Sequence, residues 1–195
     1  MHASAVVMAH GSAIAFLGDS GRGKSTLASS FYQAGFGLVT DDSMLLKLQD
    51  GQVFCLAAYP SLRLWPESVD RLFPDSADFK AVAHYSNKQQ MMLLNAKRVQ
   101  SELVPLKAIF VLGDPATASG TEAIGIERIS GAASTMALVE AAFVLDVDSS
   151  SAVKKNFQRA ARIAQSGLPF YQLGYPRHFD LLPRVRARVL EQVPV

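Results

Sequence analysis

The residues of this sequence that most clearly carry chemistry lie in one short stretch near its beginning. The stretch consists of Gly18, Asp19, Ser20, Gly21, Arg22, Gly23, Lys24, Ser25 and Thr26, and up to Ser25 it fits the pattern G-x-x-x-x-G-K-[ST] at every fixed position. Glycines at this spacing let the backbone curl until its N–H groups face phosphate oxygens, and the start of a following helix adds partial positive charge. The pattern predicts that these residues bind a nucleotide, with Lys24 at its terminal phosphates and Ser25 at Mg²⁺.

Two consecutive acidic residues, Asp41 and Asp42, follow the next apolar run along the chain. A carboxylate at the end of that predicted strand would face a metal bound at the glycine-rich stretch. Two neighbouring acids indicate two tasks, in which one holds Mg²⁺ and the other accepts the proton of an attacking hydroxyl. For at least one of them, an Asx turn or a cap of the next segment is the alternative. The pair therefore favours transfer of a phosphoryl group to a hydroxyl.

The apolar runs around these motifs predict the elements that must position them. Runs rich in aliphatic and β-branched residues indicate strands at 4–9, 13–18, 38–42, 106–114, 123–130 and 169–175, and a hairpin over 44–58 that turns at Asp50-Gly51. Apolar residues at helical spacing indicate helices at 24–32, 65–73, 131–145, 151–167 and 180–193. The polar segments 76–90 and 115–122 are expected to be an exposed loop and a flexible connection. The glycine-rich stretch thus lies between a strand and a helix, as its pattern requires.

Strands and helices interleave along the chain, which is typical of an α/β fold. The chain has 195 residues, of which 49% are hydrophobic and 18% charged, so we expect a single domain spanning residues 1–195. Cys55 is the only cysteine, which excludes an internal disulfide and fits a reducing compartment, most simply the cytoplasm.

The charge of the chain is nearly balanced. With 19 basic and 17 acidic residues the net charge is +2, so no strong field favours nucleic acid or an anionic membrane, and neither is expected as a partner. No stretch approaches the roughly 18 uninterrupted apolar residues of a membrane-spanning helix.

Residues 2–48 resemble the catalytic domain of HPr kinase/phosphorylase. In that family a histidine begins the strand before the phosphate-binding loop, and the helix after the loop leads through a glycine to a strand ending in Asp-Asp. The matching features here are His2, the loop 18–25, Gly35 or Gly37, and Asp41-Asp42. The resemblance implies an α/β P-loop kinase domain of the HPr kinase and PEP carboxykinase-like type, with a mixed sheet and flanking helices.

Carried over residue by residue, the resemblance also implies catalytic roles. Lys24 and Ser25 would bind the phosphates of ATP and Mg²⁺, and Asp42 would help to hold the metal. Asp41 would be the general base on a serine hydroxyl, and His2 would lie near the transferring phosphoryl group, with a frayed chain end as its alternative. Because that family is hexameric, the resemblance favours a homo-oligomer.

The sequence departs from the parent family in two places. It contains no Arg-Pro-Gly-Arg-Asn-like loop towards its end and no Glu-x-Arg-Gly segment after the Asp pair. Instead, "YPSLRLWPESVDRLF", "PLKAIFVLGD", "ERISGAASTMALVEAAF" and "PFYQLGYPRHFDLLP" are similar to a branch of HPr kinase-like proteins that accompany the biosynthesis of ribosomally made peptides, including lasso peptides. This similarity implies an ATP-dependent serine kinase acting on a peptide or small protein, in the lasso cases at a C-terminal serine. An HPr kinase/phosphorylase and a nucleotide-binding regulator without transfer activity are the alternatives.

Further basic residues are candidates for contacts with phosphate or substrate, each with an ordinary surface role as its alternative. They are Arg63, Lys88, Arg128 and Arg177. A guanidinium makes bidentate contacts with phosphate or carboxylate, and the last two arginines follow predicted strands, where open α/β sheets bind ligands. Lys88 is expected to be a solvated loop lysine, and Trp65 to belong to the core or to a hinge.

Overall fold

The computed structural model describes residues 1–56, 61–75, 78–83, 86–93, 103–114, 123–143 and 149–193. Its strands are β1 (Ala3–Val7), β2 (Ala13–Leu17), β3 (Gly37–Thr40), β4 (Leu45–Gln49), β5 (Gln52–Leu56), β6 (Ser61–Leu64), β7 (Lys80–Ala83), β8 (Ser86–Met92), β9 (Leu103–Leu112), β10 (Gly125–Ile129) and β11 (Phe170–Gly174). Its helices are α1 (Lys24–Gln33), α2 (Pro66–Leu72), α3 (Ala132–Glu140), α4 (Ser150–Ala164) and α5 (Leu182–Glu191), with a 3-10 turn η2 (Phe179–Leu181) before α5.

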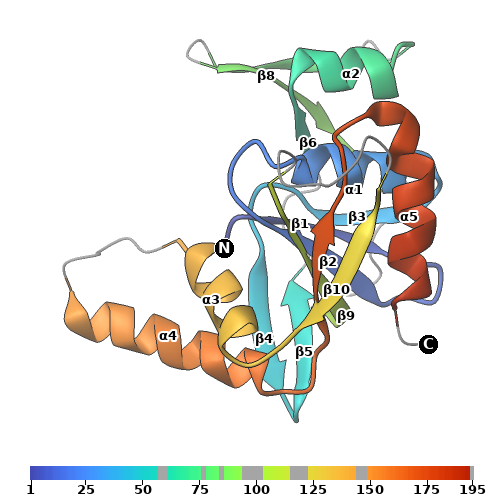
Figure 1. Ribbon diagram of the computed structural model, residues 1–195. Coiled ribbons are helices and arrows are strands. Elements are labelled where there is room, and N and C mark those ends of the chain that lie inside the picture. The colour runs from blue at the N-terminus through green and yellow to red at the C-terminus, as the bar shows by residue number, and fades with distance from the viewer. Residues whose placement is uncertain are drawn as a thin grey trace.

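The larger sheet is mixed and has the strand order β10-β11-β9-β2-β1-β3. Strands β2 and β11 pair in parallel with the second part of β9, whereas β1 pairs antiparallel with both β2 and β3. The beginning of β9 instead pairs antiparallel with β5, which carries the hairpin partner β4. These strands and their flanking helices confirm the expected mixed α/β fold (Figure 1).

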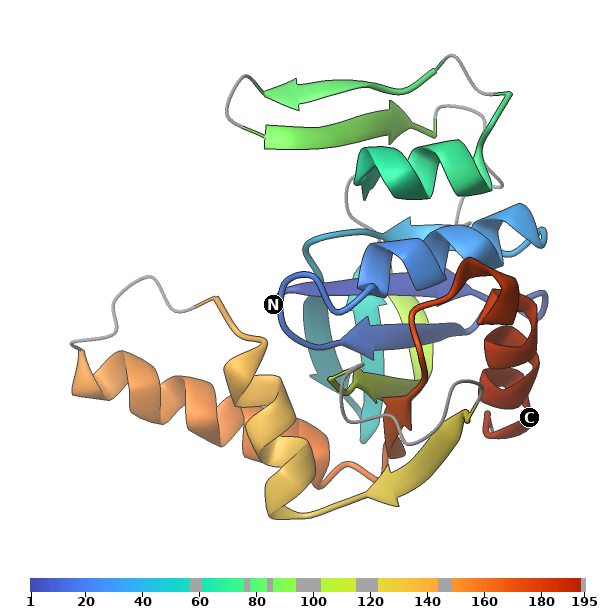
Figure 2. The same cartoon turned by 45° about the horizontal axis from the view of Figure 1, so that its top comes forward.

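Both faces of this sheet are covered, because alternate residues of its central strands enter two separate cores. On β2, Ile14 and Phe16 pack on one side with residues of α1 and α5, whereas Ala15 and Leu17 pack on the other. Helices α3 and α4 and the β4–β5 hairpin cover that second side (Figure 2). The central strand β2 is therefore apolar along its whole length, and β1 and β9 are mostly apolar, with Ser4 and Lys107 as exceptions.

A smaller sheet with the order β6-β8-β7 lies beside α1 together with α2. The exposed loop expected over residues 76–90 is wrong, because the structure forms β7 and β8 within this segment. Strand β8 pairs with β6, where Leu62 pairs with Met91, and Met91 and the following Leu93 are buried. The first five residues of β8 are all polar, so the strand lacks the apolar-polar alternation that marks a strand in the sequence.

The remaining expectations on local structure were close to the observed elements. The hairpin turns at Asp50 and Gly51, whose φ angles of 51° and 78° suit a type I′ turn. The helices start and end within a few residues of the expected bounds, except that α3 ends at Glu140 and the helix expected there ran to residue 145. The expected connection 115–122 lies outside the described residues. Within the described ranges, no helix is long and apolar enough to span a membrane.

Candidate active site

The glycine-rich loop connects the end of β2 to the start of α1, so the fold gives it the strand-loop-helix context that its pattern requires. Gly18 has φ 139°, and a Cβ there would lie 3.0 Å from the main-chain oxygen of Leu112 on β9. Gly23, the N-cap of α1, has φ 90°, and no side chain caps the first turn. The first N–H groups of α1 therefore remain available to phosphate oxygens.

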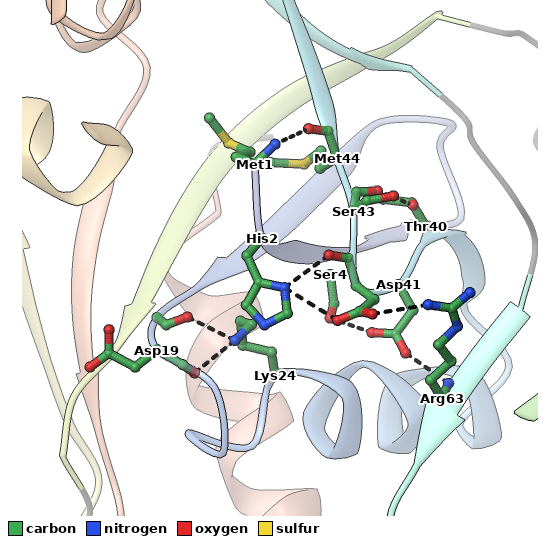
Figure 3. A network of polar contacts seen from close by, with 12 residues as sticks. Met1, His2, Ser4, Asp19, Lys24, Thr40, Asp41, Ser43, Met44 and Arg63 are labelled. Atoms are coloured by element: carbon green, nitrogen blue, oxygen red, sulfur yellow. Dashed lines mark hydrogen bonds and ion pairs between the residues drawn. The ribbon is translucent and has the colours of Figure 1, made fainter. Parts of the chain in front are cut away.

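Lys24 is the first residue of α1, and its ammonium group lies across the loop (Figure 3). The Nζ atom donates hydrogen bonds to the main-chain oxygens of Gly18 at 2.7 Å and Asp19 at 2.8 Å. The side chain is 5% exposed, and burial lowers the pKa of its ammonium group. This lysine is held inside the curve of the loop, where a terminal phosphate would lie.

A pocket of about 70 Å³ opens over the loop. Its lining brings together most of the residues singled out in the sequence, namely His2, Ser20, Gly21, Gly23, Lys24, Ser25, Thr26, Asp42, Arg63, Trp65 and Lys88. Gly18, Asp19 and Arg22 belong to the same loop, and Asp41 precedes the lining residue Asp42 in the chain. We call this cavity the phosphate pocket.

Asp41 is buried, and both oxygens of its carboxylate accept hydrogen bonds. The Ser4 hydroxyl donates to Oδ1 at 2.5 Å, and the main-chain N–H of Arg63 donates to Oδ2 at 2.9 Å. Burial raises the pKa of this carboxyl, while hydrogen bonds from Ser4, Arg63 and the hydroxyl of Ser25 oppose that rise. Asp41 is thus linked by a hydrogen bond to Ser25, the residue after Lys24 in the glycine-rich loop. The sequence reasoning missed Ser4, whose only signal was a hydroxyl inside an apolar strand.

Asp42 has the opposite surroundings. Its φ of 69° is a left-handed conformation that is uncommon outside glycine. The carboxylate lines the phosphate pocket, with Arg63 Nη1 at 3.1 Å from Oδ2 and His2 Nδ1 at 3.2 Å from Oδ1. His2 Nδ1 also lies 2.9 Å from the main-chain oxygen of Asp42, so the ring is fixed rather than frayed.

Two of the candidate cations come from the smaller sheet. Arg63 on β6 and Lys88 on β8 both line the phosphate pocket. The expectation that Lys88 is a solvated loop lysine is wrong, because it lies in a strand with Nζ 5.6 Å from the centre of the Trp65 ring. Together with Lys24, these side chains give the pocket a positive lining that suits a polyphosphate.

The other two candidate arginines lie elsewhere. Arg128 is exposed on β10 and does not line the phosphate pocket. Arg177 does not line the phosphate pocket either. Its guanidinium donates hydrogen bonds to the main-chain oxygens of Arg22 at 2.8 Å, Tyr175 at 2.6 Å and Gly113 at 2.8 Å. It therefore supports the loop through hydrogen bonds to the main chain, which sequence spacing did not reveal.

Comparisons with known proteins give similarity to solved structures. No family model matches the sequence, and no curated protein matches it. Among solved structures, the chain is similar to the "Hpr(Ser) kinase/phosphatase from Coxiella burnetii", with 13% sequence identity and a TM-score of 0.46. The alignment covers 98% of this chain and 96% of that chain. A likeness at this level supports no functional argument, so the function is argued from the site itself.

The residues around the loop fit Mg²⁺ when a nucleotide supplies further ligands. Within the part of the chain that the structure describes, no group of three or more His, Cys, Asp or Glu side chains is arranged to hold a metal on its own. Mg²⁺ is usually bound by one or two carboxylates, a hydroxyl and substrate phosphates. The Ser25 hydroxyl and the carboxylates of Asp41 and Asp42 are oxygen ligands of this kind.

Proposed function

We propose that the protein is an ATP-dependent kinase that transfers the γ-phosphoryl group to a serine hydroxyl of a peptide or small protein. One observation carries the proposal: a glycine-rich loop with Lys24 and Ser25 meets a carboxylate, Asp42, that lines the same pocket. A nucleotide binder without transfer activity needs the loop and a metal carboxylate but no second carboxylate facing the phosphates.

The loop and the cations around it hold the nucleotide. Backbone N–H groups at the start of α1 and the ammonium of Lys24 bind the phosphates, and Arg63 and Lys88 add positive charge from the smaller sheet. Ser25 and Asp41 would hold Mg²⁺, which offsets the negative charge of the transferring group when it is bound.

The geometry favours Asp42 as the general base and Asp41 as the carboxylate that helps to hold Mg²⁺. These roles are the reverse of those that the family resemblance implies. Asp42 lines the pocket, while the Asp41 oxygens already accept hydrogen bonds from Ser4, the Arg63 amide and Ser25. A base must come within hydrogen-bond reach of the proton it accepts. His2 and Arg63 hold the Asp42 carboxylate in place.

In the proposed reaction, the acceptor oxygen forms a bond to the γ-phosphorus while the bond from that phosphorus to the β,γ-bridging oxygen breaks. The acceptor proton moves to Asp42. The acceptor would enter from the side of His2, which lines both the phosphate pocket and a neighbouring cavity of about 180 Å³ that contains Asp19 and Glu140. The sequence similarity over residues 55–185 supports a precursor peptide of the lasso type as this acceptor.

The test is intact mass spectrometry after the purified protein is incubated with Mg²⁺-ATP and either a peptide ending in serine or HPr. We expect a phosphoryl adduct on the peptide, and an adduct on HPr alone would favour the parent family's substrate instead. Lys24→Ala should lower transfer at least about 10²-fold, whereas Lys47→Ala, at an exposed lysine on β4, should not. ATP binding with no transfer to either acceptor would count against the kinase and favour a nucleotide-controlled regulator.

A further inference from the structure

A second and larger cavity, of about 220 Å³, lies next to the phosphate pocket. The two share the lining residues Gly21, Gly23, Thr26 and Trp65, so they meet at the glycine-rich loop and the start of α1. The second cavity is therefore adjacent to the place where the phosphates of a nucleotide would lie. We call this second cavity the aromatic cavity.

The walls of the aromatic cavity are rich in aromatic rings. Trp65, at the start of α2, is 50% exposed, which excludes the first of its two expected positions, the core or a hinge, and it lines both cavities. Tyr175 follows β11 and Phe179 begins η2 on the opposite side. Aromatic walls of this kind suit a flat, largely apolar ring system.

The charges in the aromatic cavity argue against a second phosphate. Its described lining contains one arginine, Arg177, whose guanidinium is already committed to the main-chain oxygens of Arg22, Tyr175 and Gly113. Glu67 adds a carboxylate that would repel an anion but can accept hydrogen bonds from hydroxyl groups. This lining suits an uncharged group with hydroxyls rather than more phosphate.

The cavity is also held open by contacts within the chain. The Thr26 and Ser68 hydroxyls are 3.0 Å apart and join the start of α1 to α2. On the other side, the Arg177 guanidinium lies 3.9 Å from the centre of the Tyr175 ring and binds the loop. Such a preformed cavity needs little reorganisation to accept a ring.

We propose that the aromatic cavity binds the nucleoside of ATP, with the base against Trp65 and Phe179 and the ribose hydroxyls near Glu67. The proposal rests on the proposed function, because it assumes that the triphosphate occupies the phosphate pocket. It assigns the affinity for the nucleoside to residues 65–68 and 175–182, outside the glycine-rich motif.

The experiment compares Mg²⁺-ATP with Mg²⁺-tripolyphosphate by calorimetry, because tripolyphosphate reaches only the phosphate pocket. The wild-type protein should bind ATP at least about tenfold more tightly than tripolyphosphate. Phe179→Ala, at a residue that lines only the aromatic cavity, should weaken ATP binding about tenfold and leave tripolyphosphate affinity within twofold. Trp65→Ala should weaken ATP binding more than tripolyphosphate binding, because Trp65 lines both cavities and lies beside Lys88. Phe157→Ala, which removes an aromatic ring 49% exposed on α4, is the matched control and should change neither.

The outcomes separate this inference from the proposed function. If tripolyphosphate binds and the affinity for ATP is no higher, the aromatic cavity is not the nucleoside site. The same conclusion follows if the higher affinity for ATP is unchanged in both Trp65→Ala and Phe179→Ala. Equal weakening of both ligands by Phe179→Ala would also overturn it. If the wild-type protein binds neither ligand, the proposed function fails together with the inference. Melting temperatures of the variants show whether each is folded, and Trp65→Ala removes a half-exposed ring whose loss the core should tolerate.

Discussion

Asp41 and Asp42 are consecutive in the sequence, yet only one of them faces the phosphate pocket. Asp41 is 6% exposed and accepts hydrogen bonds from Ser4 and the Arg63 amide, whereas 28% of the Asp42 side chain is exposed beside His2 and Arg63. The left-handed backbone at Asp42 separates the two carboxylates. Their different surroundings lead to different expected effects when each is replaced.

Asp42→Asn should lower the rate of phosphoryl transfer about 10²- to 10⁴-fold, because it removes the group proposed to accept the proton. Nucleotide affinity should change little. Asp41→Asn should instead weaken Mg²⁺-ATP binding. Single-turnover kinetics and calorimetry measure the two effects. Loss of transfer with full nucleotide affinity in Asp41→Asn, and not in Asp42→Asn, would restore the roles implied by the family resemblance.

The stability of the fold should depend on pH through Asp41. Burial raises the pKa of this carboxyl above its ordinary value of 3.8, so its contribution to stability is present below that value and is lost as pH rises through the folded-state pKa. Relative to wild type, Asp41→Asn should therefore gain stability as pH increases from about 4. Melting temperatures across this range test the trend, and Asp70→Asn on α2 corrects for losing one negative charge. A difference that shrinks with rising pH would contradict the argument.

Arg177 should act as a positioning residue for the glycine-rich loop. Arg177→Gln removes charge-assisted hydrogen bonds to the main-chain oxygens of Arg22 and Gly113, so the loop should loosen and nucleotide affinity should fall by about tenfold. Amide hydrogen exchange in residues 18–23 should become faster, which a purely structural loss elsewhere would not produce.

The control for Arg177 is Arg188→Gln on α5. That arginine forms an exposed ion pair with Glu191 at 3.2 Å, which is worth at most about 1 kcal/mol. Its replacement should leave both nucleotide affinity and loop exchange unchanged. Unaltered exchange in Arg177→Gln would exclude the positioning role.

Gly18 and Gly35 offer a matched pair for the packing of the loop. Both have positive φ angles, 139° and 91°, so an alanine at either is expected to cost about 1–2 kcal/mol of unfolding free energy. Only at Gly18 would the new Cβ meet a main-chain atom, the Leu112 oxygen at 3.0 Å, which should cost a further ~1–3 kcal/mol. Denaturant unfolding of the two variants measures the difference. Equal losses would mean that β9 does not constrain the loop.

The sequence by itself determined the glycine-rich loop, its strand-loop-helix setting, the hairpin at Asp50-Gly51 and the position of the Asp pair. All of these depend on residues close together in the chain, where pattern and turn chemistry suffice. It also indicated the mixture of strands and helices correctly, because the buried strands are predominantly apolar.

The tertiary structure alone decided which side chains complete the site. Strands β6 and β8 pair through residues such as Leu62 and Met91, and this pairing carries Arg63 and Lys88 to the phosphate pocket. Arg177 reaches the loop across 155 positions of sequence. The backbone at Asp42 fixes which acid faces the pocket. Such arrangements depend on the packing of distant elements and on side-chain direction, and the local residue pattern encodes neither.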